Sequence, residues 1–212
     1  MQTVDQETSP PHSPKTPNRN GEKYPVLSTI GIVIAAFLVA GFVMAFVFRS
    51  YQVDGPSMEP TLHNNDKLII WKLGHTWGRI TGKSYVPNRG DVIVFSEQGL
   101  LAEDGTTKQL IKRVIGLPGD HVIIKDGSVK VYNQEHPAGF IPDTTLPYGK
   151  NLNLQVDNKE EIDVIIGKNE VYAMGDNRDN SLDSRIFGPV PSKDIVGKLV
   201  LRMFPLGDTK TF

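Results

Sequence analysis

An uncharged apolar run at residues 26–48, VLSTIGIVIAAFLVAGFVMAFVF, constrains this chain more than any other stretch of its sequence. As a helix it would be about 34 Å long, which is enough to cross the hydrocarbon core of a bilayer. A buried globular helix and a cleaved leader are the alternatives. The apolar core of a leader is only about 7–15 residues long, and no A-x-A pattern follows this run. We therefore expect an uncleaved transmembrane anchor.

The segments on either side of this run predict how the chain is organised. Residues 1–25 are rich in Pro, Ser, Thr and Asn, and such a segment buries too little apolar surface to offset its ordering entropy. We expect a disordered tail there. Lys15, Arg19 and Lys23 precede the run and Arg49 follows it. This bias places the tail in the cytoplasm and residues 49–212 on the outer side.

Residues 49–212 have the pattern of one mainly β domain. Short runs rich in Val and Ile alternate with turn signals, and Asp126-Gly127 is a hairpin signal. The expected strands are 66–73, 90–95, 109–116, 121–133, 169–175 and 195–204. Loops or weaker strands are expected at 74–89, 96–108 and 134–168, and residues 121–168 are a candidate for a small inserted cap. A partly open antiparallel β barrel or sandwich is the predicted fold.

Composition excludes several classes of function. The formal net charge of −1 does not indicate a nucleic-acid partner. The chain contains no cysteine, which removes disulfides, thiol catalysis and cysteine-ligated zinc. The compartment is left open by this absence.

A constrained serine, Ser57, follows the apolar run within VDGPSMEPTL at residues 53–62. Serine is a weak nucleophile until a base removes its proton, so the question is which residue could be that base. None of the histidines beyond the apolar run stands in a pattern that indicates an Asp-His relay; these are His63, His75, His121 and His136.

Lysine is the other option for a base. Lys112 and Arg113 lie within the strand-like run QLIKRVIG, where successive side chains point to opposite faces. We expect one of these faces to be buried. Burial lowers the pKa of a lysine, whereas arginine stays charged, so only Lys112 could act as a neutral base near neutral pH. An edge strand with two solvated cations remains the alternative.

A polar stretch, GDNRDNSLDSR at residues 175–185, follows another expected strand. A calcium loop of the EF-hand type is a poor match, because Arg178 takes the place of a ligand and no glycine stands at the sixth position. The alternatives are a plain turn and a hydrogen-bonded network that braces a site. In such a network Ser181 would orient a nearby amine, and Asp183 with Arg185 would form an ion pair.

Together these stretches resemble the bacterial type I signal peptidases. The resemblance rests on the apolar run followed, in the family's order, by SMEPTL at 57–62, RGDVIVF at 89–95, KRVIGLPGD at 112–120 and GDNRDNSLDSR at 175–185. It implies a Ser/Lys dyad on a mainly antiparallel β fold, with Ser57 as nucleophile and Lys112 as general base. Ser181 matches a serine that hydrogen-bonds the lysine, and Asp183 and Arg185 match a structural pair.

The same resemblance implies how substrate and oxyanion are held. Gln109, Leu110 and Ile111 match the strand that flanks an extended substrate. Gly55 stands where some family members have a serine whose hydroxyl helps to form the oxyanion hole. Here the backbone N–H of Ser57 can still donate, but a side-chain donor from Gly55 is absent.

The implied function is that of a membrane-bound serine endopeptidase that removes N-terminal signal peptides after A-x-A-like sites. Its partners would be secretory preproteins and the lipid bilayer, it would act as a monomer, and it would need no metal or other cofactor. We expect it in a bacterial-type cell membrane as a single-pass protein, or in a thylakoid membrane if the cell has one. A self-cleaving repressor and a non-catalytic membrane-tethered binding domain remain the alternatives.

Overall fold

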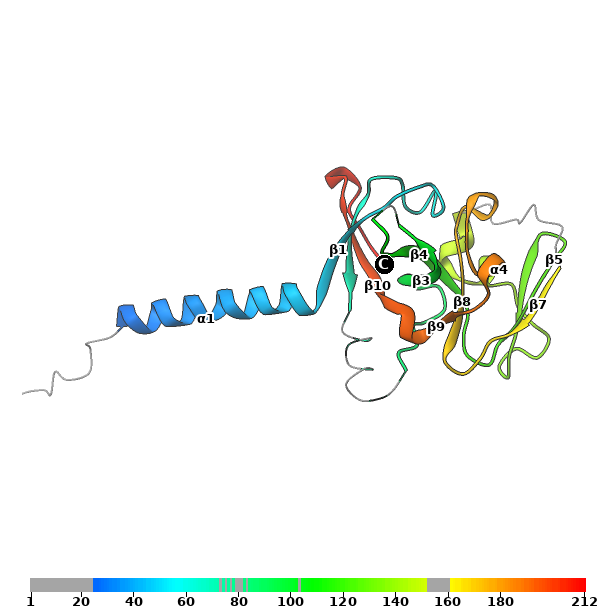
Figure 1. The fold of residues 1–212 in the computed structure, drawn as a ribbon, viewed down its shortest axis with the longest axis horizontal. Helices are drawn as coiled ribbons and strands as arrows, with labels where there is room; N and C mark the ends of the chain where they lie inside the picture. The colour runs from blue at the N-terminus through cyan, green and yellow to red at the C-terminus, as the bar shows by residue number, and fades with distance from the viewer. Residues whose placement is uncertain are drawn as a thin grey trace, which may run out of the picture. The chain divides into compact units, whose positions relative to one another are not determined.

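The computed structural model describes residues 25–72, 84–102, 104–151 and 161–212, together with residues 74, 76, 78 and 82 (Figure 1). The chain divides into two compact units, Met1–Gly41 and Phe42–Phe212. The expected disordered tail lies almost wholly outside the described residues.

A helix, α1 (Pro25–Phe46), covers most of the apolar run. Large apolar side chains on it are exposed, among them Ile32, Phe37 and Leu38. Among the residues that the structure describes, none of the helices combines the length and the apolarity that a bilayer crossing requires.

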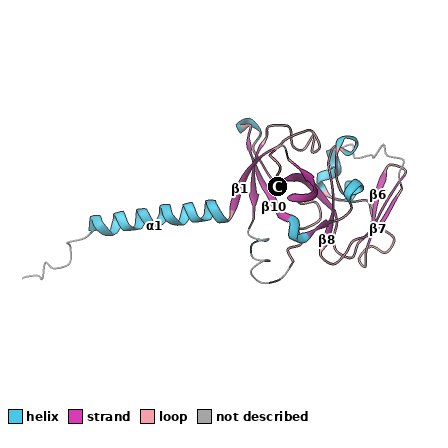
Figure 2. Ribbon diagram, in the orientation of Figure 1, coloured by secondary structure: helices cyan, strands magenta, loops and turns pink. Residues whose placement is uncertain are grey.

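Strands make up most of the regular secondary structure in the described part of the second unit (Figure 2). The strands are β1 (Phe48–Gln52), β2 (Lys67–Trp71), β3 (Val92–Leu101), β4 (Thr107–Gly116), β5 (His121–Lys125), β6 (Ser128–Tyr132), β7 (Ile162–Ile165), β8 (Glu170–Met174), β9 (Val190–Pro191), β10 (Ile195–Phe204) and β11 (Lys210–Thr211). The short helices are α3 (Pro142–Thr145), η1 (Pro147–Asn151), η2 (Arg178–Asn180), α4 (Ser184–Phe187), η3 (Ser192–Asp194) and η4 (Leu206–Asp208).

The larger sheet has the strand order β1-β2-β10-β3-β4-β8-β9, and β11 pairs with β10. The recorded pairings are antiparallel. Within the described ranges no pairing joins the two edge strands, β1 and β9, so the sheet is not a closed barrel. The prediction of a mainly β, antiparallel fold is therefore confirmed, and the open form of the sheet agrees with the expectation of incomplete closure.

A second sheet, with the order β6-β5-β7, is formed by the part of the chain for which a cap was considered (Figure 1). Its first two strands form the hairpin that the sequence predicts, with Lys125 opposite Ser128. Asp126 and Gly127 both have positive φ values, 49° and 75°. This is the backbone of a two-residue type I′ turn, which suits the twist of the flanking strands.

The six expected stretches all contain strands, but several strands were not predicted. β1, β9 and β11 lie outside every stretch for which a strand was considered, whereas β7 lies in residues 134–168, where loops or weaker strands were expected. Residues 96–101, in another stretch where loops or weaker strands were expected, extend β3, and Leu101 pairs with Thr107. The strands outside the expected stretches lack a clear two-residue alternation, so the local sequence does not predict them. Pairing with a partner strand keeps them extended.

The sequence predicts that one face of β4 is buried without indicating which, and in the structure both faces are buried. Residues 112–116 of this central strand are all buried, so both faces are covered. Ile115 belongs to a core cluster with Val122 and Tyr172, whereas Val114 belongs to another with Ile93 and Phe95. Alternation could not reveal this, because a strand covered on both sides is apolar on both sides.

Candidate active site

The turn that carries Ser57 is anchored by apolar side chains. Met58 and Leu62 are fully buried in a core cluster with Ile70 of β2. Leu62 N donates to the carbonyl oxygen of Met58 across 2.9 Å, which closes one helical turn. Ser57 itself remains partly exposed. The sequence therefore buries the residue after the serine and leaves the serine hydroxyl accessible.

Gly55 bends the chain just before the serine. Its φ is +92°, in the left-handed region where a side chain is strained and glycine is favoured. Its backbone N–H donates to Asn64 Oδ1 across 2.9 Å. This N–H is consequently engaged within the turn.

Lys112 approaches the serine from β4. Its Nζ donates to Ser57 Oγ at 2.7 Å and to the carbonyl oxygen of Ile111 at 2.9 Å. The two residues are 55 positions apart in sequence, so the fold of the sheet, rather than local sequence, brings them together. Within the described residues, Lys112 makes no ion pair with a carboxylate.

The surroundings of Lys112 favour its neutral form. Its side chain is buried, and this burial lowers the pKa of Lys112 to about 8, because desolvation penalises the charged amine. The carboxylates of Asp183 and Asp176 act in the opposite direction but do not cancel the effect of burial. A lysine with this pKa is partly deprotonated near neutral pH.

Ser57 and Lys112 open onto a cleft of about 350 Å³. Gln109, Leu110 and Ile111 also line it. The remaining lining comes from β1 and the turn after it, from β2, β3 and β4, and from the polar stretch at residues 175–185. These residues are Tyr51, Gln52, Val53, Asp54, Pro56, Leu68, Val94, Lys108, Asn180 and Leu182. The candidate nucleophile therefore faces a partly apolar groove.

The polar loop at residues 175–185 contacts the backbone around the serine. Asn177 N donates to the carbonyl oxygen of Ser57 at 3.1 Å, and Asn177 Nδ2 donates to the carbonyl oxygen of Pro56 at 3.2 Å. Sequence reasoning did not single out Asn177. Its position within a dense polar stretch was the available signal, but the partner in the serine turn could not be inferred from it.

Asp183 and Arg185 form a buried ion pair, with Nε 2.8 Å from Oδ1. Gly175 N also donates to Asp183 Oδ2 at 2.9 Å. Burial on its own would raise the pKa of Asp183, but the hydrogen bonds and charge of Arg185, together with the Gly175 N–H, hold that pKa below its ordinary value. Asp183 is therefore charged and ties the two ends of the loop together.

Ser181 does not make the expected contact with Lys112 in this structure. Its Oγ is buried and has no hydrogen-bond partner among the described residues. It lies close to Gly175, at the point where the loop passes the serine turn. The lysine amine is instead held by Ser57 and Ile111.

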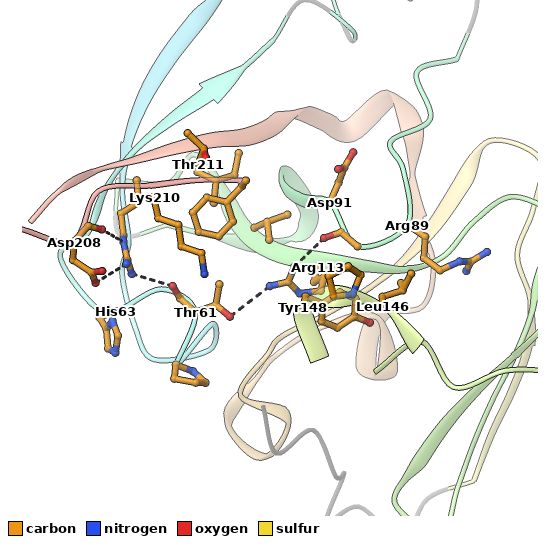
Figure 3. Close-up of a pocket in the computed structure, with 17 residues that line it drawn as sticks. Thr61, His63, Arg89, Asp91, Arg113, Leu146, Tyr148, Asp208, Lys210 and Thr211 are labelled. Atoms are coloured by element: carbon orange, nitrogen blue, oxygen red, sulfur yellow. Dashed lines mark hydrogen bonds and ion pairs between the residues drawn. The ribbon is translucent and has the colours of Figure 1, made fainter. Parts of the chain in front are cut away.

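A second cavity has a volume of about 720 Å³ (Figure 3). Arg113, Thr61 and Tyr148 are among the residues that line it. No lining residue is shared with the cleft. In the described part of the chain no group of three or more Asp, Glu or His side chains is arranged to hold a metal ion.

Comparisons with known proteins relate most of the chain to one family. The family model described as "Signal peptidase, peptidase S26" matches residues 26–204. Signal peptidase I P from Bacillus subtilis subsp. natto is 33% identical over 87% of this chain and 92% of its own length. Signal peptidase I from Bacillus caldolyticus is 32% identical over 90% and 94%, respectively. A crystal structure of a signal peptidase I from Enterococcus faecalis V583 matches 54% of this chain and 97% of its own, with 24% identity and a TM-score of 0.39.

Gly175→Ala tests how closely the polar loop must approach the serine turn. A Cβ at this position would meet the hydroxyl of Ser181 and lie 2.5 Å from the carbonyl oxygen of Ser57. We expect about 1–3 kcal/mol of destabilisation from overpacking, and slower labelling of Ser57 by a serine-directed acylating reagent. Gly99→Ala is the control, because its Cβ would make only an ordinary 3.7 Å contact. Equal labelling rates and melting temperatures in the two variants would contradict the tight approach.

Proposed function

This chain belongs to the signal peptidase family, peptidase S26, and is therefore a hydrolase; we propose that it removes N-terminal signal peptides from exported preproteins with Ser57 as nucleophile and Lys112 as general base. The 2.7 Å contact between Lys112 Nζ and Ser57 Oγ carries this proposal. The depressed pKa of the buried lysine supports it, because a base must be partly neutral at the working pH.

The first half of the reaction forms an acyl-enzyme. Ser57 Oγ attacks the scissile carbonyl carbon while Lys112 takes the hydroxyl proton. The tetrahedral intermediate then collapses, the peptide C–N bond breaks, and Lys112 passes the proton to the leaving amine. In the second half, water gives a proton to Lys112 and attacks the ester carbon. The bond to Ser57 Oγ then breaks, Lys112 returns the proton to Ser57 Oγ, and the signal peptide is released.

The negative charge on the carbonyl oxygen needs preorganised donors, each typically worth about 3–4 kcal/mol. The backbone N–H of Ser57 is one such donor in our proposal. Gly55 has no hydroxyl, and its N–H is already engaged by Asn64. Gly55 therefore serves the site through its left-handed backbone, which shapes the turn before the nucleophile.

The substrate would bind as an extended strand beside β4. Gln109, Leu110 and Ile111 pair with β3 along one edge, while the recorded pairing with β8 begins only at Arg113. The other backbone edge at residues 109–111 is thus suited to β-strand addition by a peptide. The apolar part of the cleft would accept the small residues of an A-x-A-like cleavage site.

The polar loop would support the dyad through three of its members. Asp183 and Arg185 form a buried ion pair at the end of the loop, and the hydrogen bond from Gly175 N to Asp183 would keep the loop closed. Ser181, whose buried hydroxyl lies beside Gly175, would donate to or accept from the lysine amine when the substrate displaces water from the cleft. No metal or nucleotide takes part in these steps.

We further propose that residues 26–48 anchor the enzyme in the membrane, with residues 1–25 in the cytoplasm and the catalytic domain, residues 49–212, outside. Support comes from the uncharged sequence of this run and the exposed apolar side chains of α1. Because a preprotein is held by the same bilayer, anchoring would bring its cleavage site to the cleft. A monomer would suffice for this arrangement.

The anchor can be tested by extracting membranes at alkaline pH. We expect the full chain to stay with the membrane, and the double variant Leu38→Arg, Val39→Arg to be released, since each arginine at the centre of a span costs about 2.5–3.5 kcal/mol. Thr29→Arg is the control, because an arginine near the end of the run can reach the interface. Release of the unsubstituted chain would overturn the anchor.

The dyad can be tested by preprotein cleavage. Ser57→Ala and Lys112→Ala should each reduce kcat by at least about 10³-fold, as expected when a member of a catalytic unit is lost. Lys112→Arg should be as inactive as the alanine variant, because arginine cannot accept the proton. Matched controls are Ser128→Ala and Lys125→Ala on the β5–β6 hairpin, which should cleave normally. Near-normal processing by a dyad variant would refute the mechanism.

The pKa of Lys112 also predicts a pH dependence. Below about 8 the amine is protonated and cannot act as a base, so kcat/KM should fall by about tenfold per pH unit. Above this pH the rate should level off. Measurement of kcat/KM for preprotein cleavage, with circular dichroism as a check that the fold persists, should give this profile. A rate unchanged down to about pH 5 would exclude a lysine base with this pKa.

A further inference from the structure

The polar loop is joined to a distant part of the chain by a buried ion pair. Arg178 of the loop donates through both terminal nitrogens to Asp143 of α3, at 2.6 Å and 2.7 Å. The two side chains are only 1% and 9% exposed. The pair is bidentate and charge-assisted, so it fixes direction as well as distance.

Arg178 also organises the loop from within. Its Nε donates to the carbonyl oxygen of Gly175 at 3.0 Å, and Arg185 donates to the carbonyl oxygen of Arg178 at 2.6 Å. Two residues beyond Gly175, Asn177 holds the backbone carbonyl of Ser57. A shift of Arg178 would therefore be transmitted to the backbone of Ser57 through two hydrogen bonds, one from Arg178 to Gly175 and one from Asn177 to Ser57.

Tyr148 provides a second connection between the same regions. Its hydroxyl donates to Asp143 Oδ1 at 2.9 Å, and its ring lies 4.3 Å from the guanidinium of Arg113, beside which it appears in Figure 3. Arg113 in turn pairs with Asp176 at 2.8 Å and 2.6 Å. Asp176 immediately follows Gly175, so both connections converge on the start of the loop.

A buried ion pair is weak evidence for stability, because desolvation of the two charges offsets much of their attraction. Its clearer consequence is to specify one arrangement. We propose that Asp143 is a positioning residue: through Arg178, it holds the polar loop against the backbone of Ser57, so that the α3–η1 segment completes the active site from outside the main sheet. This inference rests on the proposed function of Ser57 and Lys112.

Asp143→Asn tests the role of the charge while nearly preserving shape. We expect kcat for preprotein cleavage to fall by about 10- to 100-fold, because small misplacements of reacting groups have effects of that size. Asp163→Asn is the matched control. Asp163 also pairs with a basic side chain, His121 at 2.7 Å, but it is exposed on the second sheet. That variant should stay within about twofold of the unsubstituted enzyme, since exposed pairs contribute little.

A double variant separates positioning from stability. Asp143→Leu with Arg178→Met replaces both charges by apolar groups, which often restores stability to a buried pair. We expect it to melt at or above the temperature of Asp143→Asn while its kcat remains low. Recovery of kcat in parallel with the melting temperature would overturn the positioning role and leave only a structural one.

Hydrogen exchange on the full-length chain gives a readout independent of catalysis. In Asp143→Asn the amides of residues 175–185 should exchange faster, while those of β8 and β10 should not. Unchanged exchange in the loop would overturn the inference even if kcat fell. If Ser57→Ala still cleaved preproteins, the proposed function would fail, but the exchange experiment would still decide whether Asp143 positions the loop.

Discussion

The rest of the site depends on one constraint, the burial of the Lys112 amine. Within the described residues this amine contacts the Ser57 hydroxyl and forms no ion pair with a carboxylate. A protonated amine there would be costly, so burial lowers its pKa. That cost is sustained because β4 is a central strand with both faces covered. The same central position gives Lys112 a fixed direction toward Ser57.

Around this lysine, the other buried charges are paired. Arg113 pairs with Asp176, Arg178 with Asp143, and Arg185 with Asp183. The Arg113 pair ties the polar loop to β4 and the Arg178 pair ties it to α3, whereas the Arg185 pair lies within the far end of the loop itself. An arginine retains its charge in any environment and so suits these structural links, whereas a lysine can lose its proton. The division between arginine and lysine therefore separates the residues that hold the site from the one proposed to react.

Much of the fold could be predicted because its central strands carry local signals. Runs of Val and Ile marked β2, β3, β4 and β10, and Asp126-Gly127 marked the hairpin turn. Edge and closing segments such as β1 and β11 were missed, since they are extended only because a partner strand holds them. In the region after β6, α3 and Tyr148 could not be anticipated. Asp143 of α3 contacts Arg178, 35 positions downstream, and Tyr148 contacts Arg113 of β4.

By itself the sequence determined the residue types: a serine in a constrained turn, a lysine in an apolar strand, a polar loop and an apolar segment before them all. These follow from composition and periodicity, which act over a few residues. Tertiary structure alone decided which of them meet. The approach of Lys112 to Ser57, the position of the Ser181 hydroxyl, and the contact of Asp143 with Arg178 all depend on strand order and on both faces of β4 being covered. Those are properties of long-range packing, and no local pattern encodes the distance between residues so far apart in the chain.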